Sequence, residues 1–99
     1  MGDRICLTFT DGMEVSPILY SHWKGMGLIE EAEAFWERYH DEIRDEPSNF
    51  MVNFISYVRE GTIVDGGLYL YRTEEQACSP DDNGSWIMNT KTGAVRRYG

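Results

Sequence analysis

A strand, a tight turn and a returning strand are encoded in the first 23 residues, and this hairpin most constrains the fold. Residues 4–10 alternate between apolar and polar side chains, and a period of two is typical of a strand with one buried face. Asp11 and Gly12 follow, a pair that favours a hairpin turn because glycine accepts a positive φ. Residues 15–23 predict the returning strand, which begins near Pro17 because proline cannot donate to a ladder.

Two amphipathic helices are predicted after the hairpin. The first covers residues 28–44, where apolar side chains recur at spacings of three and four and so form one stripe. That stripe consists of Ile29, Ala32, Trp36, Tyr39 and Ile43. The second helix begins at Pro47, because a missing N–H is no loss at a first helical position, and ends before Gly61. Its stripe consists of Phe50, Met51, Phe54, Ile55 and Val58.

Three further strands complete the chain. They are predicted at residues 68–71, 85–89 and 94–98, with a polar loop at residues 74–84 between the first two. Each helix has one apolar face that must be covered, and most of the strands are joined by short turns. The sequence therefore predicts a single α+β domain over residues 1–99, in which the two helices pack on one face of a mostly antiparallel sheet.

Negative charge is concentrated in one segment. The chain has a net charge of −8, and residues 30–46 contribute eight acidic and two basic side chains. Direct binding to nucleic acid is disfavoured, because phosphates need neutralising cations that such a surface lacks. No apolar run approaches the roughly 18 residues that a membrane span needs, and no secretory leader is visible. We therefore expect a cytoplasmic protein without membrane contact.

Several short motifs, in this order, resemble a group of small uncharacterised proteins of phages, prophages and other prokaryotic genomes. The motifs are FTDG at residues 9–12, LYSHW at residues 19–23 and Asp82-Asn83 before the final hairpin. The resemblance covers residues 5–95, although the central helical segment is more acidic here. It implies an intracellular α+β domain often carried by mobile elements, and it implies no activity.

His22 is the candidate for acid–base or ligand-binding chemistry, because an imidazole titrates near neutral pH. The motifs suggest a polar cluster, which consists of Asp11, Tyr20, His22, Trp23, Asp82 and Asn83. The alternative is that His22 is a structural residue at the end of a strand. A plain hairpin would separate Asp11 from His22, which weakens a catalytic dyad, so we predict no enzymatic activity and no cofactor.

A metal site has suitable ligand types but unsuitable spacing. Cys6, His22, His40 and Cys78 lack the close-paired arrangement of zinc sites. We therefore predict no metal site. Both cysteines are expected to stay reduced, because a reducing cytosol opposes a disulfide.

The acidic segment carries the main functional hypothesis. From Glu30 to Glu46 a helix would rise about 24 Å, so its eight carboxylates average one per ~3 Å, close to the roughly 3.4 Å between phosphates of one nucleic-acid strand. We predict a non-enzymatic binding protein that occupies a basic, nucleic-acid-binding surface of a host or defence protein, as an inhibitor. Its predicted contact residues are Glu30, Glu33, Glu37, Asp41, Tyr69 and Tyr71.

Three alternatives compete with this hypothesis. The acidic helix could simply be a solvated face that keeps the protein soluble. A small enzyme or ligand-binding domain could use His22 with Asp11, Asp82 and Asn83. A self-associating structural protein is the third alternative.

Overall fold

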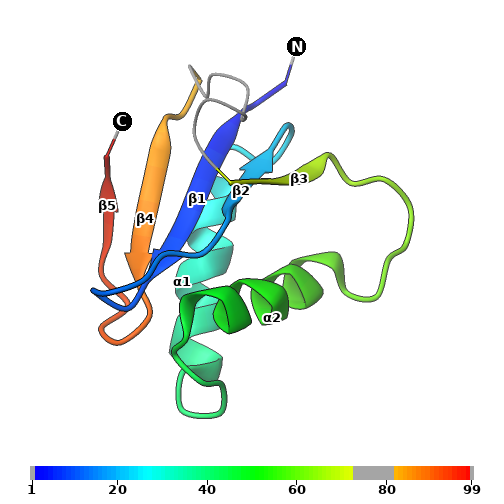
Figure 1. The fold of residues 1–99 in the computed structure, drawn as a ribbon. Helices are drawn as coiled ribbons and strands as arrows, with labels where there is room; N and C mark the ends of the chain where they lie inside the picture. Colours follow the sequence, from blue (N-terminus) through cyan, green and yellow to red (C-terminus); the bar gives the residue numbers. More distant parts are fainter. Residues whose placement is uncertain (1, 73–81, 99) are drawn as a thin grey trace.

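The computed structural model describes residues 2–72 and 82–98 and confirms the α+β class. A five-stranded sheet has two helices on one side (Figure 1). Its elements are β1 (Ile5–Thr10), β2 (Ile18–Ser21), α1 (Gly27–Tyr39), α2 (Pro47–Arg59), β3 (Leu68–Tyr71), β4 (Ser85–Asn89) and β5 (Val95–Arg97). Within the described ranges, neither helix is long and apolar enough to cross a bilayer.

The sheet is mixed, with the strand order β3-β2-β1-β4-β5. Three of its pairings are antiparallel, as expected, but β1 and β4 run parallel. Parallel neighbours need a long connection between them, and here β2, β3 and both helices lie between β1 and β4 in the chain. The central strand β1 therefore joins the two halves of the sequence.

The core lies between β1 and the two helices. The ring of Phe9 packs edge-on against Phe50 and Phe54, at centroid distances of 5.0 and 5.5 Å. Phe35 of α1 meets the same two rings at 5.1 and 5.5 Å. Such aromatic pairs contribute about 0.5–1.5 kcal/mol each beyond the area they bury. One ring cluster thus connects the central strand to both helices.

The first helix ends five residues earlier than predicted, at Tyr39 rather than Arg44. At this end the His40 ring stacks on Trp36 at 4.0 Å, and the Trp36 carbonyl accepts both the His40 Nδ1 over 2.8 Å and the His40 backbone N–H over 3.0 Å. The Tyr39 carbonyl accepts the N–H groups of Glu42 and Ile43 in the turn that follows, so a carbonyl of the last helical turn is bound outside the helix. Residues 41–46 fall in the connection to α2, so their carboxylates do not lie on a helix.

The predicted turn at Asp11-Gly12 is confirmed. Gly12 has a φ of 97°, and the Asp11 carboxylate accepts the backbone N–H groups of Met13 and Glu14 over 2.9 and 2.8 Å. These bonds, that of Glu14 first, lower the pKa of Asp11. The returning strand β2 is shorter than the predicted 15–23, because regular pairing begins only after the proline.

Truncation of the ring cluster should destabilise the whole domain. We expect Phe54→Ala to lower the free energy of unfolding by about 3–5 kcal/mol, because it leaves a cavity under β1. Chemical denaturation measures the change. Val52→Ala in the same helix is the control, since Val52 is 63% exposed, and it should change stability by less than about 0.5 kcal/mol. Equal losses in the two variants would contradict this description of the core.

Candidate functional site

Backbone hydrogen bonds gather four separate segments at one end of the sheet. Asp3 N–H donates to the His22 carbonyl over 2.7 Å, and His22 N–H donates to the Gly67 carbonyl over 2.9 Å. Cys6 N–H donates to the Gly84 carbonyl over 3.1 Å. The end of β2 thus lies between the residues that precede β1 and those that precede β3, and β4 starts nearby.

His22 is held by an aromatic group on the sheet face that points away from the helices. The Tyr20 hydroxyl and the His22 Nδ1 lie 2.9 Å apart. Tyr20 is almost fully buried, and its ring lies 5.7 Å from Tyr69 and 6.2 Å from Tyr71. Tyr69 and Tyr71 therefore lie on the same face of the sheet as Tyr20, and the Tyr20 phenol fixes the orientation of the imidazole.

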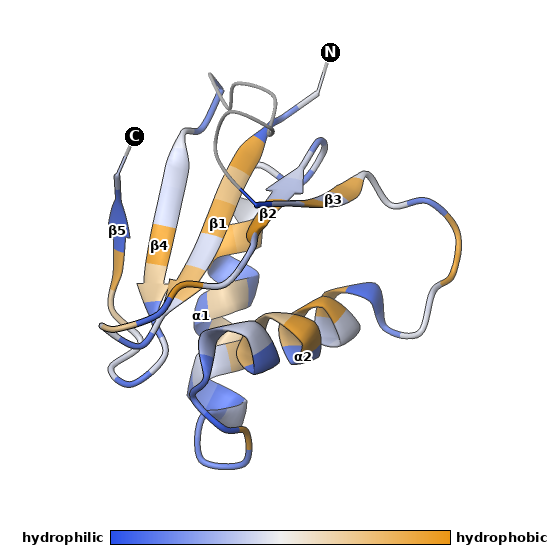
Figure 2. Ribbon diagram, viewed as in Figure 1, coloured by the Kyte–Doolittle hydropathy of each residue, from blue (hydrophilic) through white to orange (hydrophobic). Residues whose placement is uncertain are grey.

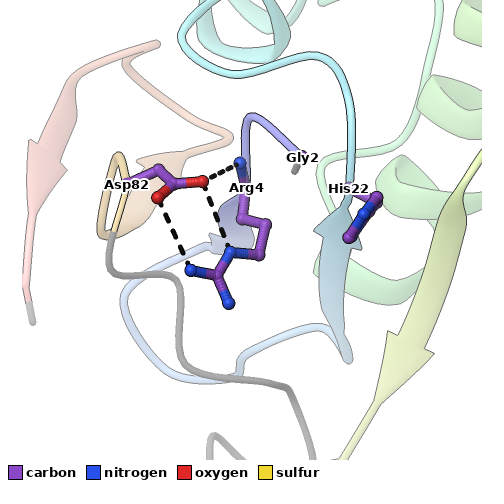
Figure 3. A pocket seen from close by; sticks show the side chains of 4 residues that line it. All are labelled: Gly2, Arg4, His22 and Asp82. Atoms are coloured by element: carbon purple, nitrogen blue, oxygen red, sulfur yellow. Dashed lines mark hydrogen bonds and ion pairs between the residues drawn. The ribbon is translucent and has the colours of Figure 1, made fainter.

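Asp82 lies at the same end of the sheet, across a hollow from His22, and binds Arg4 (Figure 3). The Asp82 carboxylate accepts the Arg4 backbone N–H over 3.0 Å and the Arg4 Nε and Nη2 over 3.3 and 3.5 Å. The backbone N–H and then the guanidinium lower the pKa of Asp82, and positive charge on His22 adds a smaller effect. Arg4, His22 and Asp82, with Gly2, line a hollow of about 220 Å³.

Asn83 ties the start of β1 to the start of β4. Its Nδ2 donates to the Asp3 carboxylate over 2.6 Å and to the Arg4 carbonyl over 2.8 Å, while its own carbonyl accepts the Trp86 indole N–H over 2.8 Å. These three hydrogen bonds give Asn83 a structural role, because they connect the segments that precede β1 and β4. The residue therefore supports the site without facing it as a reactive group.

A second hollow, of about 370 Å³, opens on another side of His22. The described residues that line it are His22, Trp23, Asp65, Gly67 and Tyr69. Trp23 is 59% exposed and meets the imidazole edge-on at 4.3 Å, while Tyr69 is 47% exposed. Asp65 accepts the Gly67 N–H through Oδ1 over 2.8 Å. Two exposed aromatic rings and a carboxylate thus meet in one hollow, which we call the aromatic–acidic hollow.

Gly67 is required beneath this hollow. A Cβ at that position would lie 2.5 Å from the Trp23 ring, and its φ of 72° also favours glycine. Trp23 therefore lies directly over the backbone at the start of β3. Asp65 was missed as a site residue by the sequence analysis, because only the pairing of β3 with β2 brings it beside Trp23.

The structure brings together most of the predicted polar cluster but not all of it. Tyr20, His22, Trp23, Asp82 and Asn83 meet at one end of the sheet. Asp11 was wrongly included, because it lies in the β1–β2 turn, where its carboxylate binds the turn backbone. The expectation that a plain hairpin separates the two residues is thus confirmed.

The cluster has no carboxylate–imidazole pair among the described residues. The hydrogen bonds of Asp82 go to Arg4, and the imidazole Nδ1 is bound by Tyr20. A general base normally needs such an orienting bond or a substrate proton within reach. In the same described part, no three His, Cys, Asp or Glu side chains are placed to hold a metal ion. Cys78 and most of the predicted 74–84 loop lie outside the described residues.

Several carboxylates of the acidic segment are paired with cations of the chain itself. Glu31 lies 3.0 Å from Lys24, Glu42 lies 3.0 Å from Arg38, and Asp45 lies 2.9 Å from Lys91. Asp41 lies 3.3 Å from His40 Nε2. On α1 itself, three exposed glutamates make no ion pair with any cation in the described ranges. They are Glu30, Glu33 and Glu37, which we call the acidic stripe.

The Asp82 carboxyl should titrate below the ordinary aspartate pKa of about 3.9. Arg4→Ala removes the guanidinium but keeps the backbone N–H, which is the larger cause of the shift, so the pKa should rise only part of the way. Carbon-13 NMR of the carboxyl measures both values, with Arg96→Ala on β5 as the control. Because the folded pKa is lowered, the stabilisation is present above about pH 3.9 and is lost as the pH falls through the folded value. A complete return to the ordinary pKa in Arg4→Ala would contradict this assignment.

Comparison with protein-family models, curated proteins and solved structures finds no match to this chain.

Proposed function

We propose that the protein is a non-enzymatic binding protein whose partner presents a basic segment. One observation carries the proposal: Trp23, Tyr69 and Asp65 line the same hollow. An aromatic face attracts a cation through its quadrupole, and a nearby carboxylate adds a charge-assisted hydrogen bond. A lysine or arginine side chain of the partner is the group that fits both.

Arginine suits the aromatic–acidic hollow better than lysine. Its planar guanidinium can stack on an indole or phenol ring while its N–H fork binds a carboxylate. A cation–π contact contributes about 0.5–1 kcal/mol at an exposed site and about 2 kcal/mol when it is desolvated. With Trp23 and Tyr69 about half exposed, one such contact gives modest affinity, so the partner needs further basic residues.

The acidic stripe would attract the further basic residues of the partner electrostatically. The helix that bears Glu30, Glu33 and Glu37 begins only four residues after Trp23. A net charge of −8 also raises the encounter rate with a basic partner. Basic surfaces of this kind are typical of proteins that bind nucleic acid. We therefore propose a nucleic-acid-binding protein as the partner, which would be inhibited when the basic surface is occupied.

A small-ligand function around His22 is the second candidate. It is favoured by the hollow that Arg4, His22 and Asp82 line together, since two of these groups can carry positive charge. Inorganic phosphate is a suitable probe for this candidate. Shifts of the His22 ring signals in NMR, lost in Arg4→Ala, would support it, and unchanged signals at saturating phosphate would exclude an anion as the ligand.

Removal of the exposed indole should weaken binding of a basic peptide. A fluorescein-labelled deca-arginine peptide, followed by anisotropy at low salt, is the probe. We expect Trp23→Ala to raise Kd by about five- to tenfold, because it removes a contact of about 1–1.4 kcal/mol. Met13→Ala is the control, since Met13 is 94% exposed in the β1–β2 turn, and it should leave Kd unchanged. Equal Kd values for all three proteins would contradict the proposed hollow.

Charge reversal distinguishes the effect of the acidic stripe on peptide binding from the effect of the overall net charge. Glu37→Lys and Glu14→Lys change the net charge equally, but Glu14 lies in the β1–β2 turn. We expect Glu37→Lys to raise Kd for the same peptide at least about threefold more than Glu14→Lys at low ionic strength. The difference should shrink at about 1 M salt, where charges are screened. Equal effects of the two variants would show that the stripe has no special role.

A further inference from the structure

β3 is an edge strand, and no described residue hydrogen-bonds to its outer edge. The His22 N–H donates to the Gly67 carbonyl, so this residue pair is a hydrogen-bonded pair of the β2–β3 ladder. Hydrogen-bonded and non-hydrogen-bonded pairs alternate in an antiparallel ladder. The N–H and C=O groups of Leu68 and Leu70 therefore point away from β2. Natural sheet edges usually carry charges or proline that prevent further pairing. The sequence of β3, Leu-Tyr-Leu-Tyr, has neither. Leu70 is 52% exposed at this edge.

An apolar groove runs beside this edge, on the helix side of the sheet. Its volume is about 280 Å³, and it is lined by Leu19, Ile55, Arg59, Leu68, Tyr69 and Leu70. The exposed edge and the groove adjoin each other through Leu68 and Leu70, and Arg59 is the one charged side chain in the described lining of the groove.

The loop that precedes β3 projects from the body of the domain and is apolar at its tip (Figures 1 and 2). Ile63 is 95% exposed and Val64 is 67% exposed. The Arg59 guanidinium donates to the carbonyls of Thr62 and Val64, and a Cβ at Gly66 would lie 2.5 Å from its Nη1. The loop is therefore given a defined shape by the side chain at its base, while its apolar residues are left to solvent.

We infer that a second copy of this chain covers the β3 edge, and that the protein is a two-fold dimer with one sheet continuous across both copies. In a two-fold interface the same patch faces itself. Antiparallel pairing of β3 with β3 of the other copy satisfies the outward N–H and C=O groups of Leu68 and Leu70 in both copies. The apolar groove and the projecting loop of each copy then contact the same features of the other copy.

Charge favours this occupant over a basic partner. A chain with a net charge of −8 repels its own copy over most of its surface, so association needs an uncharged patch. Residues 61–71 contain a single charged side chain, Asp65. Asp65 lines the aromatic–acidic hollow, and the described lining of the groove holds no carboxylate, only the Arg59 guanidinium, which donates to the carbonyls of Thr62 and Val64. A basic partner would therefore find no charge to pair with in the groove, whereas a second copy would bury apolar side chains against its own. The dimer would also present two aromatic–acidic hollows, because Tyr69 lies on the sheet face away from the groove side of Leu70.

Sedimentation equilibrium of the full chain tests this inference. We expect a mass of about twice 11.4 kDa, with dissociation only on dilution. Leu70→Lys should raise the dimer dissociation constant at least about tenfold, because a lysine protects a sheet edge. Met13→Lys, an equal change at another exposed apolar residue, should leave the constant unchanged. Near-UV circular dichroism confirms that each variant is folded.

Two further readouts keep the test decisive. Hydrogen exchange at the Leu68 and Leu70 amides of the wild-type chain should slow as its concentration rises. The dimer should persist at about 1 M salt, because apolar contacts are not screened, whereas the proposed binding of a basic peptide weakens there. A wild-type mass of 11.4 kDa at up to about 1 mM protein, or a dimer that Met13→Lys breaks and Leu70→Lys does not, would overturn the inference.

Discussion

The ring cluster that joins Phe9 of the central strand to α2, and through α2 to α1, is the interaction on which the rest of the structure depends. Phe9 packs against Phe50 and Phe54 of α2, and these two rings pack in turn against Phe35 of α1. Because β1 pairs with β2 on one side and β4 on the other, fixing β1 against the helices fixes the register of the sheet. The face away from the helices is then available for the tyrosines and His22.

The candidate site lies where that register brings distant segments together. The backbone of His22 binds both Asp3 and Gly67, so a residue near the start of the chain and one near β3 become its neighbours. Trp23 then lies over Gly67 and beside Asp65. Lys24 and Lys91 pair with Glu31 and Asp45, whereas the acidic stripe on α1 makes no ion pair within the described ranges.

Local patterns were sufficient to predict the elements but not their neighbours. Period-two alternation predicted β1, and the spacing of Trp36 and Tyr39 predicted α1. The helix ends at Tyr39, where the His40 ring stacks on Trp36, a contact that a periodic pattern does not contain. Local patterns could not predict the strand order, because the parallel pairing of β1 with β4 joins residues about 80 positions apart. Asp65 was missed as a site residue for the same reason.

Chemical-shift mapping by NMR with the deca-arginine peptide tests the central claim most directly, because it locates the contact residue by residue. If a basic segment enters the aromatic–acidic hollow, the Trp23 indole N–H and the Gly67 and Tyr69 amides should shift most, followed by the amides of Glu30 and Glu33. Shifts confined to the β1–β2 turn or to β5, or spread evenly over all acidic residues, would contradict a defined binding site at this end of the sheet.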